Sequence, residues 1–212
     1  MGGVAEGHDY GELLENNRLW VDQRLAEDPG YFRRLAEGQR PAFLLIGCSD
    51  SRKPLNVITQ TEPGELFIHR NVANQVGADD LNVQAVLDFA IGSLEVRHVI
   101  VCGHTRCGGV QAALDGSARG PVRRWLEPLE ELRRSIAAEL EALDEPEARA
   151  DLLSARNVVA QVEAVAASPA YQSCRDRGAA PSLHGWLFRV ETGLIEELEL
   201  PMKHWRGRGL VD

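Results

Sequence analysis

The chain has 212 residues, of which 44% are hydrophobic and 26% are charged, and both fractions are ordinary for a globular protein. Its 23 Lys and Arg against 32 Asp and Glu give a net charge of −9, which argues against nucleic acid or an anionic membrane as the main partner, since both require a basic face. No apolar run approaches the ~18 residues of a membrane helix, and the first residues lack a signal-peptide core. Four cysteines without a CxxC pair fit a reducing compartment, so we expect a cytoplasmic protein.

The sequence of the N-terminal part predicts a tail followed by two helices. We predict a flexible tail over residues 1–8 and one domain over 9–212. Asp9 can cap a helix that runs to about Ala26, because its apolar side chains recur at helical spacing. A second helix is expected from Tyr31 to Ala36 after a Pro-Gly pair. We expect residues 9–37 to form a helical arm on a partner subunit, and packing on the chain's own sheet is an equally open alternative.

The rest of the chain alternates short apolar runs with helical patterns. The apolar runs predict buried strands at 42–47, 66–69, 98–102 and 182–190, followed by an edge hairpin through 194–200. Helical spacing predicts helices at 80–94, 110–114, 122–143, 147–167 and 171–177. This order of elements is typical of an α/β fold in which helices flank a central, mainly parallel sheet.

Two reactive clusters follow the first and third of these strands. Cys48, Asp50 and Arg52 would share one side of an extended segment. His104 and Cys107, three residues apart at the start of a helical turn, would share a face. Because the carboxyl ends of parallel strands meet at one edge of a sheet, we expect the two clusters to lie together. Two thiolates, one imidazole and one carboxylate form a ligand set that favours Zn²⁺.

The sequence is compatible with two roles for Asp50. Two thiolates make Zn²⁺ a weak Lewis acid, so a bound water needs help to ionise. Asp50, held by a bidentate pair with Arg52, could orient the resulting hydroxide, whereas direct binding of Asp50 to the metal would close the site. A structural Asp–Arg pair, a purely structural zinc site and a disulfide between Cys48 and Cys107 are the competing interpretations.

Four motifs resemble those of the β-class carbonic anhydrases. They are CSDSR at 48–52, EPGELFIHRNVAN at 62–74, GHTRCGG at 103–109 and LHGW at 183–186, and the likeness covers roughly residues 10 to 200. The resemblance implies four parallel strands plus an antiparallel edge strand. It also implies a zinc-dependent lyase that reversibly hydrates carbon dioxide to bicarbonate and a proton through a zinc-bound hydroxide. The expected assembly is a homodimer or homotetramer, with no nucleic-acid or membrane partner.

The resemblance also implies roles for single residues. Cys48, His104 and Cys107 match the permanent zinc ligands, and Asp50 and Arg52 match the catalytic dyad. The substrate pocket is expected around Gln39, Phe67, Val72, Phe89 and Gly108. The position of Phe89 carries a Tyr in the family, so this pocket loses a hydroxyl. The alternatives are a hydrolase of carbonyl sulfide or carbon disulfide on the same scaffold, and a non-catalytic zinc protein that senses bicarbonate.

Overall fold

A computed structural model of the chain describes residues 9–212, so the predicted tail at 1–8 lies outside the described residues. The chain divides into two compact units, one ending at Gln39 and the other beginning at Arg40.

The first unit consists of the two predicted helices, α1 (Tyr10–Glu27) and α2 (Tyr31–Ala36). Asp9 caps α1 as predicted: its carboxylate accepts the Glu12 backbone N–H at 3.0 Å, and the Glu12 carboxylate accepts the Asp9 N–H at 3.1 Å. Three aromatic rings join the two helices edge to face, those of Trp20, Tyr31 and Phe32. No residue of α1 is buried, and several of its apolar side chains, such as Leu13 and Leu14, are exposed.

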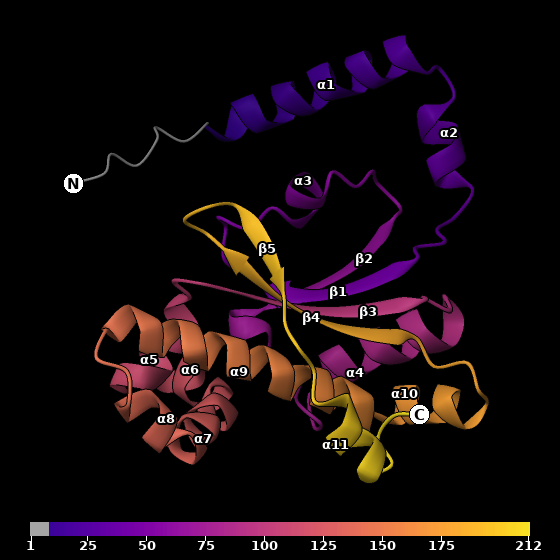
Figure 1. Cartoon of the computed structure of the whole chain (residues 1–212). Helices are drawn as coiled ribbons and strands as arrows, with labels where there is room; N and C mark the ends of the chain where they lie inside the picture. Colours follow the sequence, from indigo (N-terminus) through magenta and orange to yellow (C-terminus); the bar gives the residue numbers. More distant parts are fainter. Residues whose placement is uncertain (1–8) are drawn as a thin grey trace. The chain divides into compact units, whose positions relative to one another are not determined.

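The second unit is built on one five-stranded sheet with the order β2-β1-β3-β4-β5 (Figure 1). The strands are β1 (Phe43–Cys48), β2 (Leu66–Asn71), β3 (His98–His104), β4 (Ser182–Arg189) and β5 (Leu194–Glu197). The first four run parallel, and β5 pairs antiparallel with β4. The predicted fold class is therefore confirmed, with strand starts within one residue of those expected from the apolar runs.

Helices cover both faces of this sheet (Figure 1). They are α3 (Leu55–Thr59), α4 (Leu81–Leu87), α5 (Gly108–Asp115), α6 (Gly120–Trp125), α7 (Glu127–Ser135), α8 (Ala137–Glu141), α9 (Pro146–Ala167), α10 (Pro169–Asp176) and α11 (Met202–Gly207). The main core packs one sheet face, including Leu44 and Val99, against α4, α9 and α10. The opposite face packs Leu45 and Ile100 against α3. Alternate residues of each strand thus enter different cores, as the pleat requires.

Two predicted helices differ in detail from the structure. The segment expected as one helix over 122–143 forms the three short helices α6, α7 and α8, interrupted at Leu126 and Ile136. Pro128 contributes to the first interruption, because it has no N–H to donate to the carbonyl of Arg124. The helix expected over 80–94 begins after an Asp80 cap as α4, then widens into a π-helical turn at Asp88–Ser93.

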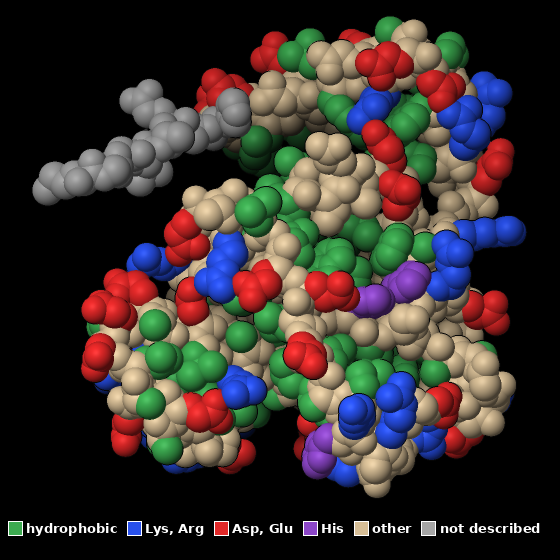
Figure 2. All heavy atoms as spheres, in the orientation of Figure 1, with side chains coloured by type: hydrophobic (Ala, Val, Ile, Leu, Met, Phe, Trp, Pro, Cys, Tyr) green, Lys and Arg blue, Asp and Glu red, His purple; other side chains and the backbone are tan. Residues whose placement is uncertain are grey.

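The surface of the second unit carries mixed charge. Figure 2 shows acidic and basic side chains interspersed over the helices α5 to α9. Among residues 9–212, no helix has both the length and the apolar character that crossing a membrane demands.

Candidate metal centre

The two reactive clusters meet at the carboxyl edge of the sheet. Cys48 is the last residue of β1, and His104 is the last residue of the neighbouring parallel strand β3. Cys107 immediately precedes α5, so the chain turns from β3 into that helix beside Cys48. The ligand atoms of these three buried residues all lie within 4.8 Å of one another. His104 therefore belongs to a strand and not to the predicted helical turn, yet it still faces Cys107.

The donor atoms fit a tetrahedral metal site. The two sulfur atoms, Cys48 Sγ and Cys107 Sγ, are 3.9 Å apart, close to the ~3.8 Å that tetrahedral Zn–S bonds of about 2.3 Å would give. His104 Nδ1 lies 2.8 Å from the carbonyl oxygen of Thr105, so Nδ1 carries the proton and donates it there. The other ring nitrogen, Nε2, is buried without a hydrogen-bond partner. A lone pair left without a partner in this way is suited to a metal ion.

The pKa values of the two thiols, Cys48 and Cys107, also suit a site for a cation. The hydrogen bond between the two sulfur atoms lowers the pKa of Cys48, although burial opposes this shift. The same contact, together with burial, raises the pKa of Cys107. The pair therefore shares one proton when no cation is near. A divalent cation would allow both sulfurs to ionise, because it compensates the second negative charge.

Asp50 is held by Arg52 beside this cluster. Arg52 Nε donates to Asp50 Oδ1 at 2.9 Å and Arg52 Nη2 donates to Oδ2 at 2.7 Å, and the Arg52 backbone N–H also reaches Oδ1 at 2.9 Å. These bonds hold the pKa of Asp50 well below its ordinary value, and Arg52 is the main cause. The Oδ2 atom lies 3.9 Å from His104 Nε2, too far for a hydrogen bond. Asp50 is thus paired with Arg52, and the choice between the two roles left open by the sequence stays a prediction.

The local backbone differs from the predicted extended segment. Residues 51 and 52 form a turn, so strand alternation does not explain why Cys48 and Asp50 face one region. The turn is fixed by the Asp50 side chain itself, which accepts the backbone N–H two residues further on.

The loop that follows β2 also contacts the cluster, a contact that the sequence did not predict. The backbone N–H of Ala73 donates to Cys48 Sγ at 3.4 Å, and Ala73 reaches this position with a left-handed φ of 61°. Two side-chain amides hold the Ala73 carbonyl in place, those of Gln75 at 2.8 Å and Asn157 at 2.9 Å. The available sequence signal was Asn157 and Gln161, two polar residues four apart on the buried face of α9.

The predicted substrate residues fall in three places. Val72 and Gly108 adjoin the cluster, since each neighbours a residue that contacts it, and a Cβ on Gly108 would meet nothing within 4 Å. Phe67 and Phe89 lie together, with ring centroids 5.8 Å apart. However, Phe67 is four register positions before the partner of Cys48, which is about 13 Å along the strand. Gln39 belongs to the first unit, so its role stays a prediction.

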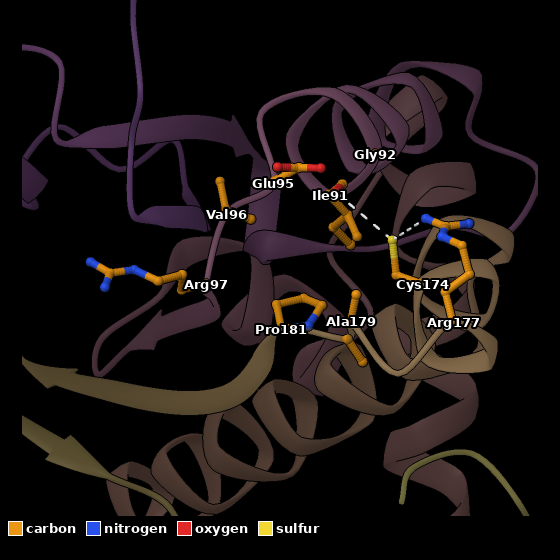
Figure 3. Close-up of a pocket in the computed structure, with 10 residues that line it drawn as sticks. Ile91, Gly92, Glu95, Val96, Arg97, Cys174, Arg177, Ala179 and Pro181 are labelled. Carbon is orange, nitrogen blue, oxygen red and sulfur yellow. Dashed lines mark hydrogen bonds between the residues drawn. The ribbon is translucent and has the colours of Figure 1, made fainter.

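A separate cavity of about 420 Å³ lies at the amino ends of β3 and β4. Figure 3 shows Cys174 and Arg177 on one side of it and Arg97 on the other. Arg177 Nη2 donates to Cys174 Sγ at 2.8 Å, and Cys174 also contacts the Ile91 carbonyl at 3.8 Å. Within residues 9–212, Cys48, His104 and Cys107 form the one group of three potential ligands. This cavity is therefore distinct from the metal centre.

A parallel sheet with convergent thiol and imidazole ligands at its carboxyl edge places the chain among α/β proteins built to hold a metal ion there. A family profile described as carbonic anhydrase matches residues 43–195, well over half of the chain. The chain belongs to the carbonic anhydrase family, in its β class, and is a lyase of that type.

Known relatives agree with this assignment. The carbonic anhydrase of Emericella nidulans is 39% identical over 197 residues, covering 93% of this chain and 86% of the relative. The β-carbonic anhydrase CafA of Aspergillus fumigatus superposes with a TM-score of 0.88 at 35% identity, covering 97% of this chain and all of that one (100%). A Coccomyxa β-carbonic anhydrase, solved with acetazolamide, gives 0.87 at 36% identity, with 95% and 92% of the two chains covered. One of two tetrameric enzymes of Sordaria macrospora gives 0.85 at 37% identity, with 89% and 96% covered.

Proposed function

We propose that this chain binds one Zn²⁺ through Cys48, His104 and Cys107 and reversibly hydrates carbon dioxide to bicarbonate and a proton. The observation that carries the proposal is the convergence of three buried ligand atoms within 4.8 Å, one of them a ring nitrogen without a partner. The ligand set is borderline soft and leaves one tetrahedral corner, which suits catalytic zinc. When bound, Zn²⁺ supplies the Lewis acidity that makes water acidic enough to deliver hydroxide near neutral pH.

In this proposal Asp50 and Arg52 act at the fourth coordination position, which the three ligands leave free. Because Arg52 keeps the pKa of Asp50 low, Asp50 is a carboxylate at neutral pH and accepts a hydrogen bond there. Its Oδ2 atom, 3.9 Å from His104 Nε2, can orient a hydroxyl group toward the substrate. Arg52 is itself anchored to the carbonyl of Arg106 at 2.9 Å, so the carboxylate keeps one direction.

The substrate pocket requires a second subunit in this proposal. Carbon dioxide is small and uncharged, so it suits the space beside Val72 and Gly108. Phe67 is about 13 Å along the sheet from the register of Cys48, and Phe89 packs against Phe67, so in this proposal both line the space from a partner. We place Gln39 and the arm 9–37 at the same contact, in a homodimer or homotetramer. The unburied α1 and the tetrameric relatives from Sordaria macrospora support this assembly.

Hydrolysis of carbonyl sulfide on the same site is the second candidate, because Phe89 lacks the hydroxyl that the family's Tyr would provide. A bicarbonate sensor without activity would not need the Asp50–Arg52 pair. We also propose a cytoplasmic location, in which the four free cysteines would remain reduced.

Stopped-flow assays with carbon dioxide and with carbonyl sulfide would test these assignments. We expect the zinc-loaded wild type to hydrate carbon dioxide and Asp50→Asn to lose about 100-fold or more in turnover while keeping its zinc. Asp115→Asn, an exposed aspartate bonded to Ser117, is the matched control and should behave as wild type. Turnover of carbonyl sulfide alone would favour the second candidate. Stoichiometric zinc with neither activity would favour the sensor.

A further inference from the structure

The turn between two of the proposed ligands presents two carbonyl groups to the metal centre. The carbonyl of Thr105 accepts the Nδ1 proton of His104 at 2.8 Å and so fixes the ring tautomer. The carbonyl of Arg106 accepts Arg52 Nη2 at 2.9 Å and so fixes the guanidinium that holds Asp50. Both the ligand and the dyad therefore depend on how this two-residue turn is oriented.

The turn is not held by its own backbone preference. Arg106 has a left-handed φ of 56°, a conformation that costs a non-glycine residue about 1–2 kcal/mol. Thr105 is fully buried, and its N–H continues the pairing with β4 through the Phe188 carbonyl at 3.0 Å. A contact from outside residues 104–107 must therefore stabilise the left-handed conformation of Arg106.

One carboxylate bonds to both side chains of the turn. Glu191, in the hairpin between β4 and β5, accepts the Thr105 hydroxyl at 2.7 Å through Oε2 and Arg106 Nε at 2.8 Å through Oε1. The Thr105 hydroxyl in turn accepts the Val190 N–H at 3.0 Å. A second carboxylate near the turn, that of Glu147, lies farther from Arg106, at 3.6 Å.

The charge of Glu191 is secured by the same contacts. The hydrogen bond from Thr105 and the one from Arg106 lower the pKa of Glu191 to about 2, so it stays ionised throughout the neutral range. The side chain is 43% exposed, and ion pairs at such positions contribute little to overall stability. Its effect is therefore expected in the geometry of the turn more than in the stability of the fold.

We infer that Glu191 is a positioning residue of the metal centre: it fixes the Thr105–Arg106 turn so that its two carbonyls orient His104 and Arg52. The inference rests on the proposed function only for its kinetic consequence. The orientation of His104 is a property of the chain that can be measured without substrate.

The test compares Glu191→Ala and Glu191→Gln with Glu196→Ala in the zinc-loaded chain. Glu196 is the matched control, because it lies on the same hairpin, is 50% exposed and also pairs with an arginine, Arg189 at 2.8 Å. Glu191→Ala should lower kcat for carbon dioxide about 10-fold while KM stays within about twofold, as for other residues that orient metal ligands. Glu191→Gln keeps one acceptor oxygen and should recover part of the loss.

The second measurement is the Nδ1–H resonance of His104 in protein labelled with ¹⁵N-histidine. In wild type and in Glu196→Ala it should exchange slowly, and in Glu191→Ala it should shift and exchange faster. Unchanged kcat and an unchanged resonance in Glu191→Ala would overturn the inference, as would a loss of kcat that merely follows a loss of zinc. A wild type inactive on carbon dioxide would refute the proposed function, while the His104 resonance would still decide the role of Glu191.

Discussion

At the scale of single residues, two glycines beside the ligands serve opposite purposes. Gly103 precedes His104 in β3, and a Cβ there would lie 2.6 Å from Val158 Cγ2 on α9. Gly108 follows Cys107, and a Cβ there would meet nothing within 4 Å. The first glycine thus lets a helix approach the strand that carries a ligand, whereas the second borders open space.

We predict that Gly103→Ala lowers the free energy of unfolding by about 1–3 kcal/mol, because the added methyl overfills the contact with α9. Urea denaturation of the zinc-loaded chain would measure the loss. Val158→Ala in the same chain should restore part of it, since it removes the colliding methyl. Gly108→Ala is the control and should leave the unfolding free energy within about 0.5 kcal/mol. Equal stabilities for the two alanine variants would contradict the packing argument.

At the scale of elements, α9 supports the loop that contacts Cys48. Asn157 Nδ2 donates to the Ala73 carbonyl, and Asn157 Oδ1 accepts the amide of Gln75 at 2.9 Å. Gln161, one turn further along α9, accepts the Val76 N–H at 2.6 Å. These buried amides hold a loop in which Ala73 and Asn74 both have positive φ, 61° and 48°. The helix therefore stabilises a backbone shape that the loop alone would not adopt.

Asn157→Ala should destabilise the chain by about 1–3 kcal/mol, because it removes two buried hydrogen bonds, one to the Ala73 carbonyl and one from the Gln75 amide. Ala73→Gly in the same chain should recover about 1 kcal/mol, since glycine adopts the left-handed conformation without steric cost. A double-mutant cycle by denaturant unfolding would measure this coupling. Ser154→Ala, also buried on α9 but with a hydroxyl that has no hydrogen-bond partner, is the control. Additive effects of the changes at positions 73 and 157 would refute the coupling.

Prediction from the sequence succeeded where local patterns suffice. Short apolar runs located all four parallel strands, and the strand-end positions of Cys48 and His104 brought the ligands together. The uninterrupted helix over 122–143 was wrong because apolar spacing continues through residues whose backbone leaves the helix, such as Leu126. The bond from Asn157 to the Ala73 carbonyl and the bond from Thr105 to Glu191 were not predicted, because each joins residues more than 80 positions apart. The spacing of Asn157 and Gln161 can mark a polar site on the buried face of α9, but it does not name the partner on the other side of the contact.

At the scale of the whole molecule, the metal centre connects distant parts of the chain. Cys48 and Cys107 are separated by 59 positions and are brought together by the pairing of β1 with β3. An ion held by both would restrain this long segment in the folded state only. Metal binding should therefore contribute to folding stability.

We predict that removing zinc with a chelator lowers the Tm by roughly 10 °C, the shift expected for the loss of about 3–4 kcal/mol in a chain of this size. Differential scanning calorimetry before and after chelation would measure it, and restored zinc should restore the Tm. Cys48→Ser should start at the lower Tm and show no response to the chelator. A wild type that carries one zinc per chain yet melts at the same temperature without it would contradict the prediction.

The pairing of β1 with β3 also determines when during folding the proposed site can select a metal ion. A newly made chain offers only scattered thiols and imidazoles, whose affinities for divalent metals follow the Irving–Williams order and owe nothing to the geometry of a site. The three proposed ligands, Cys48, His104 and Cys107, come together only after β1 and β3 have paired. Selection among metals by this site would therefore require the folded sheet. The composition of the cell's metal pool during synthesis should therefore matter less than its composition after folding.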